Sequence, residues 1–132
     1  MPDYTLVNFS DAEDMAASHG LSPQLESRFL RQHLDSEHLG VSFFKVAPDF
    51  RTPFGHKHSV QEEAYVIVAG SGRFKLDDDI VEVKQGDVLR VAPSVMRAFE
   101  SGPDGVEIVA IGSDRPPDGD GEMQPNWWTD QA

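Results

Sequence analysis

The spacing of hydrophobic positions changes after the first third of the chain from a helical period to a strand period. In that first third, apolar residues recur every three or four positions, which is the repeat of one face of an α-helix. Two stretches there begin with a serine that is able to cap a first turn, Ser10 and Ser22. The pattern predicts a helical N-terminal segment, residues 1–37, with short helices over residues 10–20 and 22–34.

Further along the chain, the hydrophobic positions alternate, which is the repeat of a strand with one buried face. Glycine, proline or aspartate separates most of the strand-length stretches, and short strands at such intervals favour an antiparallel sandwich or small barrel. The stretch AYVIVA is apolar on both faces and is expected to be a central strand. The predicted strands of this domain, residues 38–112, cover residues 39–47, 64–69, 72–76, 80–83, 87–91, 96–100 and 106–112.

The last segment, residues 113–132, is rich in proline, glycine and aspartate and has no hydrophobic period. Two adjacent tryptophans stand out in it, Trp127 and Trp128, because a purely solvated tail rarely carries such large apolar side chains. We expect them to dock this segment onto the barrel or onto a second copy of the chain.

Composition narrows the class of protein. The chain has 132 residues, the size of one ordinary domain, and its formal net charge of -12 opposes binding to nucleic acid or to an anionic membrane surface. It has no cysteine, which excludes disulfides and thiolate chemistry. No secretory signal and no apolar run of about 18 residues is visible, so the expected location is the cytoplasm.

The candidate chemistry lies in the stretch FGHKHSVQEEAYVIVAG. His56 and His58 are two residues apart, so a strand would place both imidazoles on the same face. Glu63 lies five residues beyond and can reach the same point from a facing strand after a short turn. Two imidazole nitrogens and one carboxylate, with positions left open, suit one divalent metal ion: iron, manganese, nickel, cobalt or zinc.

This stretch resembles the first motif of the cupin superfamily. That motif has two histidines separated by one residue, a glutamate after three or four more, and a glycine after a further six. His56, His58, Glu63 and Gly70 match every interval, whereas Phe50 occupies the place of an expected earlier glycine. The resemblance implies a mainly β fold, the cupin double-stranded β-helix or jelly-roll barrel, preceded here by the short N-terminal helices.

The second cupin motif is matched less well. It begins here with Gly86 and Asp87 and continues through an apolar strand. Ala92 then stands where proline is expected, Ser94 where glycine is expected, and Arg97 where the third metal-binding histidine is expected. The resemblance is therefore specific for the fold and less so for the function.

Arg97 leaves three alternatives open. A guanidinium stays protonated and has no lone pair for a metal, so Arg97 cannot be the missing ligand. In the first alternative His56, His58 and Glu63 still hold the metal, and Arg97 is turned aside or binds a substrate carboxylate. In the second the metal is lost, Arg97 pairs with Glu63, and the cavity binds a small anion or performs acid–base chemistry with a histidine. In the third the strand has another register and Arg97 faces solvent.

The resemblance implies a small-molecule enzyme of the oxygenase, isomerase, lyase or cyclase type that acts at the metal on a small anionic substrate. In that function Arg97 would counter a substrate carboxylate, and Tyr65 would serve as a hydrogen-bond donor or acid. The alternative is a metal-free binding module that holds an anion through Arg97 without turnover. Exposed strand edges in such barrels also predict a homodimer.

Overall fold

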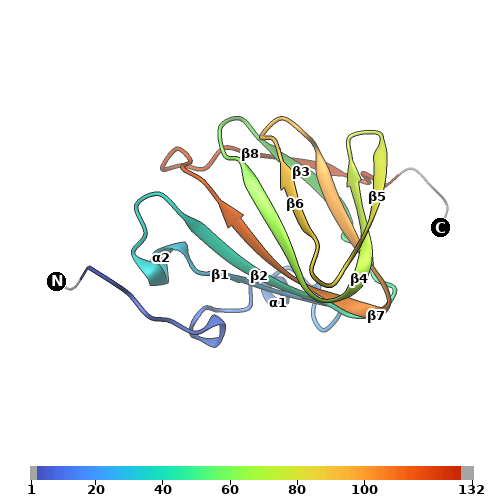
Figure 1. Cartoon of the computed structure of the whole chain (residues 1–132), viewed down its shortest axis with the longest axis horizontal. Helices are drawn as coiled ribbons and strands as arrows, with labels where there is room; N and C mark the ends of the chain where they lie inside the picture. The colour runs from blue at the N-terminus through green and yellow to red at the C-terminus, as the bar shows by residue number, and fades with distance from the viewer. Residues whose placement is uncertain (1–2, 129–132) are drawn as a thin grey trace.

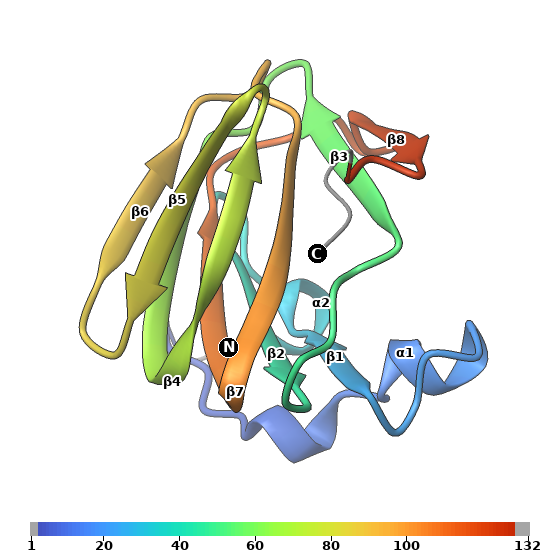
Figure 2. The same cartoon turned by 90° about the vertical axis from the view of Figure 1, so that its right-hand side faces the viewer.

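The structure, a computed structural model, describes residues 3–128. Its eight strands form one antiparallel sheet that curls into a barrel (Figures 1 and 2). The order β1-β2-β7-β3-β8 runs around the sheet, and β4 pairs with β5, β6 and β7. The strands are β1 (Leu25–Phe29), β2 (Gly40–Val46), β3 (Phe54–His58), β4 (Glu63–Leu76), β5 (Asp79–Lys84), β6 (Val88–Val91), β7 (Arg97–Gly112) and β8 (Gly121–Pro125).

The two longest strands, β4 and β7, are each a fusion of two stretches that the sequence predicts as separate strands. Gly70 and Gly105, both with φ of 76°, mark the bend at which the paired strands turn together. A Cβ atom on Gly70 would overlap the carbonyl oxygen of Gly105, so the strands can cross this closely only with glycine there. Glycine in this sequence therefore bends the strands where the sequence pattern suggested that they end. We call this bend the corner end of the barrel, and the opposite end, which carries His56, His58 and Glu63, the open end.

The predicted helix over residues 22–34 is wrong. Residues Leu25–Phe29 form β1, which pairs with β2 in the register Leu25 to Val46 and Phe29 to Ser42. Only one helical turn follows, α2 (Arg31–Leu34). The stretch LESRF also satisfies a period of two, with Leu25 and Ser27 buried, so pairing with the exposed edge of β2 outweighs a weak local helix preference.

The predicted helix over residues 10–20 is much shorter than expected. A 3-10 turn, η1 (Phe9–Asp11), is capped by Asn8, and the single turn α1 (Met15–Ser18) is capped by the side chain of Asp14. The Asp14 carboxylate also accepts a hydrogen bond from the backbone N–H of Ser27 on β1. The cap therefore ties the short helix to the sheet.

The C-terminal segment packs against the outside of β3. β8 pairs with β3 along its whole length, which adds a strand that the sequence pattern did not predict. Trp127 lies over Gly55, where a Cβ atom would come within 2.7 Å of the indole, and the Lys75 ammonium lies 3.5 Å from its ring centroid. The Trp128 Nε1–H donates to the carbonyl of Thr52 at 3.1 Å.

The corner end of the barrel is filled with apolar side chains. Phe74, Ile67 and Ile108 are at most 1% exposed, and Tyr65 and Phe99 pack onto Phe74 with ring centroids 5.0 and 5.6 Å away. The same core continues through Val106 and Ala110 on β7, and this layer supports the site at the open end.

None of the helices in residues 3–128 has the length and apolar character that a membrane span requires.

Candidate metal centre

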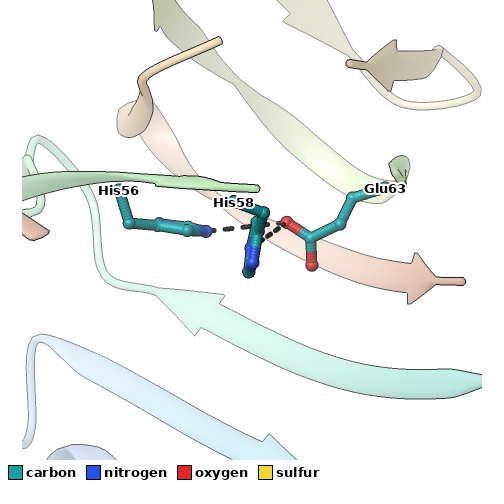
Figure 3. A group of neighbouring side chains, drawn as sticks. All are labelled: His56, His58 and Glu63. Atoms are coloured by element: carbon teal, nitrogen blue, oxygen red, sulfur yellow. Dashed lines mark ion pairs between the residues drawn. The ribbon is translucent and has the colours of Figure 1, made fainter. Parts of the chain in front are cut away.

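Three side chains converge at the open end of the barrel (Figure 3). The Nε2 atoms of His56 and His58 lie 3.5 and 3.3 Å from the same carboxylate oxygen, Oε1 of Glu63. One ligand atom from each residue can be chosen so that all three lie within 4.8 Å of one another. The predicted convergence of these residues on one point is therefore present in the structure.

Local strand geometry explains the convergence. On β3 the two histidines point into the barrel, while Gly55, next to His56, faces outward beneath Trp127. The turn after His58 brings the chain back as β4, whose first residue is Glu63. On the other side of β3, His56 is paired with Arg97 at the start of β7.

The carboxylate of Glu63 is the most contacted group of the cluster. Its Oε1 accepts a hydrogen bond from the Tyr65 hydroxyl at 2.8 Å and lies 3.4 Å from Nη1 of Arg97. Burial alone would raise the pKa of Glu63, but the close contacts with His56 and His58 and the hydrogen bond from Tyr65 outweigh it and hold the pKa well below its usual range. Glu63 is therefore ionised at any physiological pH.

Arg97 is fully buried, at 0% exposure, so the alternative in which it faces solvent is wrong. Its Nη2 donates to the carbonyl of Ala92 at 2.8 Å and its Nη1 contacts Glu63, while Nε has no hydrogen-bond partner among the described residues. The guanidinium thus offsets the charge of Glu63, and the backbone of the β6–β7 connection holds it in position. Pairing with Glu63 is the contact that the metal-free alternative expects, but the pairing leaves both histidines in place.

Tyr65 is buried at 2% exposure, next to Glu63 on the inner face of β4. Burial raises its pKa well above the ordinary value, and the negative charge of Glu63 raises it further. The hydroxyl therefore keeps its proton and donates it to Glu63 in a hydrogen bond.

One further residue belongs to the site, Asp120, which the sequence pattern does not predict. Its Oδ1 accepts a hydrogen bond from Nδ1 of His58 at 2.8 Å, and its Oδ2 accepts from the backbone N–H groups of Val60 and Gln61, both at 2.8 Å. The Asp120 side chain is 1% exposed. It lies just before β8 in a stretch with no hydrophobic period, and the only signal in the sequence is an aspartate among turn residues.

Asp120 determines which nitrogen of His58 can serve as a ligand. A carboxylate at Nδ1 requires the proton there, which leaves the lone pair of the neutral imidazole on Nε2. Nε2 is buried, has no hydrogen-bond partner among the described residues, and lies 3.3 Å from Oε1 of Glu63. Burial lowers the pKa of His58, but Glu63 and Asp120 on either side together raise it above the ordinary value, so a metal must compete with a proton for this ring.

These side chains form one end of a cavity of about 490 Å³, which is within the size range of small-molecule sites. The remainder of its wall is largely apolar and comes from the short helices α1 and α2 and from β1, β2, β3, β7 and β8. The aromatic residues of that wall are Phe29, Phe44, Phe54 and Phe99.

Comparison with known proteins agrees with this architecture. Residues 42–111, more than half of the chain, match the family model described as the cupin domain. A curated relative, the uncharacterized protein MJ1618 of Methanocaldococcus jannaschii, is 39% identical over 46 residues, which is 35% of this chain and 37% of that protein. The match thus spans about a third of the relative, which is itself uncharacterized, and it assigns no activity to this chain.

Solved structures share the fold at low sequence identity. A cupin protein of Bacteroides fragilis, BF4112, superposes with a TM-score of 0.71 at 23% identity, covering 89% of both chains. The polyketide cyclase RemF of Streptomyces resistomycificus gives 0.70 at 17% identity, covering 96% of this chain and 87% of that one. A single-substitution variant of the oxalate decarboxylase of Bacillus subtilis gives 0.70 at 18% identity, covering 86% of this chain but only 32% of the decarboxylase.

Proposed function

The chain belongs to the cupin family, and we propose that it is a metal-dependent enzyme that acts on a small organic anion inside the barrel. His56, His58 and Glu63 are the proposed ligands of one divalent ion. The observation that carries the proposal is the buried Nε2 of His58, which has no hydrogen-bond partner in the described chain, is oriented by Asp120, and lies 3.3 Å from the Glu63 carboxylate.

The donor set fits a metal. Two neutral imidazoles and one carboxylate leave coordination positions for a substrate, as in mononuclear sites that hold iron, manganese, nickel, cobalt or zinc. Arg97 opposes the metal electrostatically, because a divalent cation near a guanidinium is repelled. Glu63 offsets this repulsion, and Asp120 behind His58 adds a second negative charge.

The residues of this chain have distinct parts in the proposed mechanism. A bound metal would polarise a substrate oxygen as a Lewis acid. Tyr65 and Arg97 contact Glu63 and are both buried, so we assign them to hold its carboxylate ionised and oriented. Asp120 holds the ring of His58, and the apolar wall excludes water from the substrate.

The reaction belongs to one of the classes that the cupin fold supports: oxygenation, isomerisation, lysis, decarboxylation or cyclisation. Two of the structural neighbours are, by their names, a polyketide cyclase and an oxalate decarboxylase. At identities under 20% they support the choice of an enzyme fold and do not select the reaction.

The test is the metal content of protein purified without a histidine tag. We expect about one equivalent of metal in the unchanged chain and background levels in His58→Ala and Glu63→Gln, because each variant removes one of three ligands. His38→Ala is the matched control, since His38 is exposed and pairs only with Glu37 and Asp114 among the described residues. Stoichiometric metal that persists in His58→Ala would overturn the proposed ligand set.

A second function is favoured by one observation, the contact between Arg97 and Glu63. In this case the barrel is a metal-free binding module, and the ion pair takes the place of the metal. Background metal in the unchanged chain, together with binding of an organic anion and no turnover, would support it. The homodimer stays a prediction, which analytical ultracentrifugation can measure.

A further inference from the structure

The charges that line the cavity are opposite to those of the rest of the chain. The whole chain has 23 acidic residues against 11 lysines and arginines. Among the described residues, the cavity wall has a single acidic residue, Glu63, whose charge is already offset by Arg97. Two further arginines line the same cavity, Arg31 and Arg115, so the wall has a positive surplus inside a strongly negative protein.

Ion pairing sets these two arginines apart from the others. Among residues 3–128, Arg31 and Arg115 are the arginines that form no ion pair with a carboxylate, although acidic residues are twice as common as basic ones. The other five arginines each contact a glutamate: Arg28 with Glu26, Arg51 and Arg73 with Glu100, Arg90 with Glu62, and Arg97 with Glu63.

Arg31 is held in place at the open end. Its Nη2 donates to the carbonyl of Ser113 at 3.0 Å, and its guanidinium lies on Gly40, where a Cβ atom would come within 2.6 Å of Nη2. Gly40 pairs with Gly112, which also pairs with Glu63. The guanidinium of Arg31 is therefore fixed at the same end of the barrel as the candidate metal ligands.

Arg115 reaches the cavity from the connection between β7 and β8, two residues after Ser113. Figure 1 places this connection and α2, which carries Arg31, at the same end of the barrel. Arg31 and Arg115 both lie outside residues 42–111, the part that matches the family model, so the family match itself does not account for them.

The rest of the cavity wall is aromatic and favours a ligand with an apolar part. Phe44 packs against Phe29 and Phe99 with ring centroids 5.9 and 5.5 Å apart, and these aromatic rings face the same cavity as the arginines. Phe29 is 49% exposed and so is available to cover a bound ligand. A small hydrophilic anion would leave these rings exposed to water. An anion with an apolar part would cover them and gain free energy from the burial of apolar surface.

We propose that the ligand of this cavity is an amphipathic carboxylate, bound through its anionic group by Arg31 and Arg115 and through its apolar body by the phenylalanine wall. A guanidinium donates two parallel hydrogen bonds to a carboxylate, which suits these two arginines better than any neutral group. The inference rests on the proposed function, since the same cavity contains the candidate metal centre, and it names the substrate class of that site.

Binding of simple carboxylates tests the inference. The probes are hexanoate, octanoate and 3-phenylpropanoate, compared with acetate and with the neutral 3-phenylpropanamide, each titrated by calorimetry into the full chain. We expect at least one of the three apolar carboxylates to bind about tenfold or more tightly than acetate, and 3-phenylpropanoate to bind more tightly than its amide. Binding of the amide as tight as that of the acid, or no probe better than acetate, would overturn the proposal.

Variants locate the anion. Arg115→Gln should weaken binding of the best probe about tenfold, because a charge-assisted hydrogen bond is lost. Arg31→Gln should do the same, and Arg31→Lys, which keeps the charge, should weaken it less and shows that the fold survives. Arg90→Gln is the matched control, since Arg90 pairs with Glu62 outside the cavity wall. Unchanged binding in both glutamine variants would contradict the inference.

The two proposals fail separately. Metal content is measured in the same samples, and we expect Arg115→Gln to retain the metal of the unchanged chain. If the unchanged chain holds no metal but the arginine variants still weaken carboxylate binding, the metal centre is wrong and the carboxylate site stands. If the metal is present and the variants bind the probes normally, the carboxylate site alone is wrong.

Discussion

At the corner end of the barrel, β4 and β7 contribute Phe74, Ile67 and Ile108, which pack without exposure to solvent. At the open end the same two strands contribute Glu63 and Arg97, which face a cavity. Inward and outward positions alternate on each side of the bulges near Gly70, so the strand pattern does not distinguish the two ends. What differs is the group placed there, and each of these two charged groups has a partner supplied by another strand or loop.

The comparison indicates how stability and function are divided. Apolar side chains at the corner end gain free energy from burial alone, whereas buried charges at the open end cost desolvation unless they are paired. The charged groups of the open end are therefore stable only together, because their partners come from β3, β4, β7 and the segment before β8. Three comparisons probe this division, in order of the largest loss in the free energy of unfolding that each is expected to show.

Phe74→Ala removes the aromatic ring at the centre of the corner end. We expect a loss of about 3–5 kcal/mol, since a fully buried phenylalanine leaves a cavity. Phe29→Ala at the open end, where the ring is half exposed, should cost about 1 kcal/mol. Urea denaturation of both variants measures the difference, and equal losses would mean that the two ends are not packed differently.

Arg97→Met removes the buried cation that faces Glu63. The metal-free variant should lose about 3 kcal/mol, because a buried carboxylate is left with too little compensating charge. Excess zinc or manganese should stabilise this variant more than the unchanged chain, since the metal then replaces the missing positive charge. Urea denaturation with a chelator and with metal gives the comparison, and an equal gain in both proteins would exclude an electrostatic competition between Arg97 and the metal.

Asp120→Asn weakens the hydrogen bonds that hold His58 and the turn before β4. We expect a loss of about 2 kcal/mol and a metal affinity reduced about tenfold or more. Asp118→Asn, at an exposed position in the same connection, is the matched control and should change neither. Isothermal calorimetry with zinc measures the affinity, and a normal affinity in Asp120→Asn would remove Asp120 from the site.

The unchanged chain and Asp120→Asn should also differ with pH. Burial raises the pKa of Asp120, but hydrogen bonds from Gln61, Val60 and His58 outweigh it and lower the pKa from 3.8 to about 2. A carboxylate with a lowered pKa stabilises the fold fully above about pH 4 and loses that stabilisation as the pH falls toward about 2. The difference in unfolding free energy between the two proteins, measured by urea denaturation, should therefore narrow over that range.

The three proposed ligands could be predicted from the sequence because their arrangement is local. Strand alternation brings His56 and His58 to one face, and a short turn returns the chain to Glu63. The inward position of Arg97 follows from the same alternation and from the second motif. Asp120 could not be found this way, since its contact with His58 spans 62 residues and depends on closure of the barrel.

The fold class could be predicted from the sequence, but strands β1 and β8, near the two ends of the chain, could not. The stretch LESRF fits a helix stripe and a strand alternation equally well, and only the free edge of β2 decides for the strand. β8 has no hydrophobic period because all five of its residues are exposed, so its pairing with β3 depends on backbone hydrogen bonds and on an exposed ion pair between Lys57 and Glu122 rather than on an apolar face. The glycines that suggested strand ends instead allow β4 and β7 to bend.

The position of Asp120 has a practical consequence for anyone who shortens this chain. A fragment cut at residue 112, close to the limit of the family match, would keep all three donor side chains and most of the barrel. It would lose the Asp120 carboxylate, which holds the His58 ring, and it would also lose Arg115. Such a trimmed protein could fold and still give a misleadingly weak titration with metal, so experiments on minimal versions should extend at least through β8.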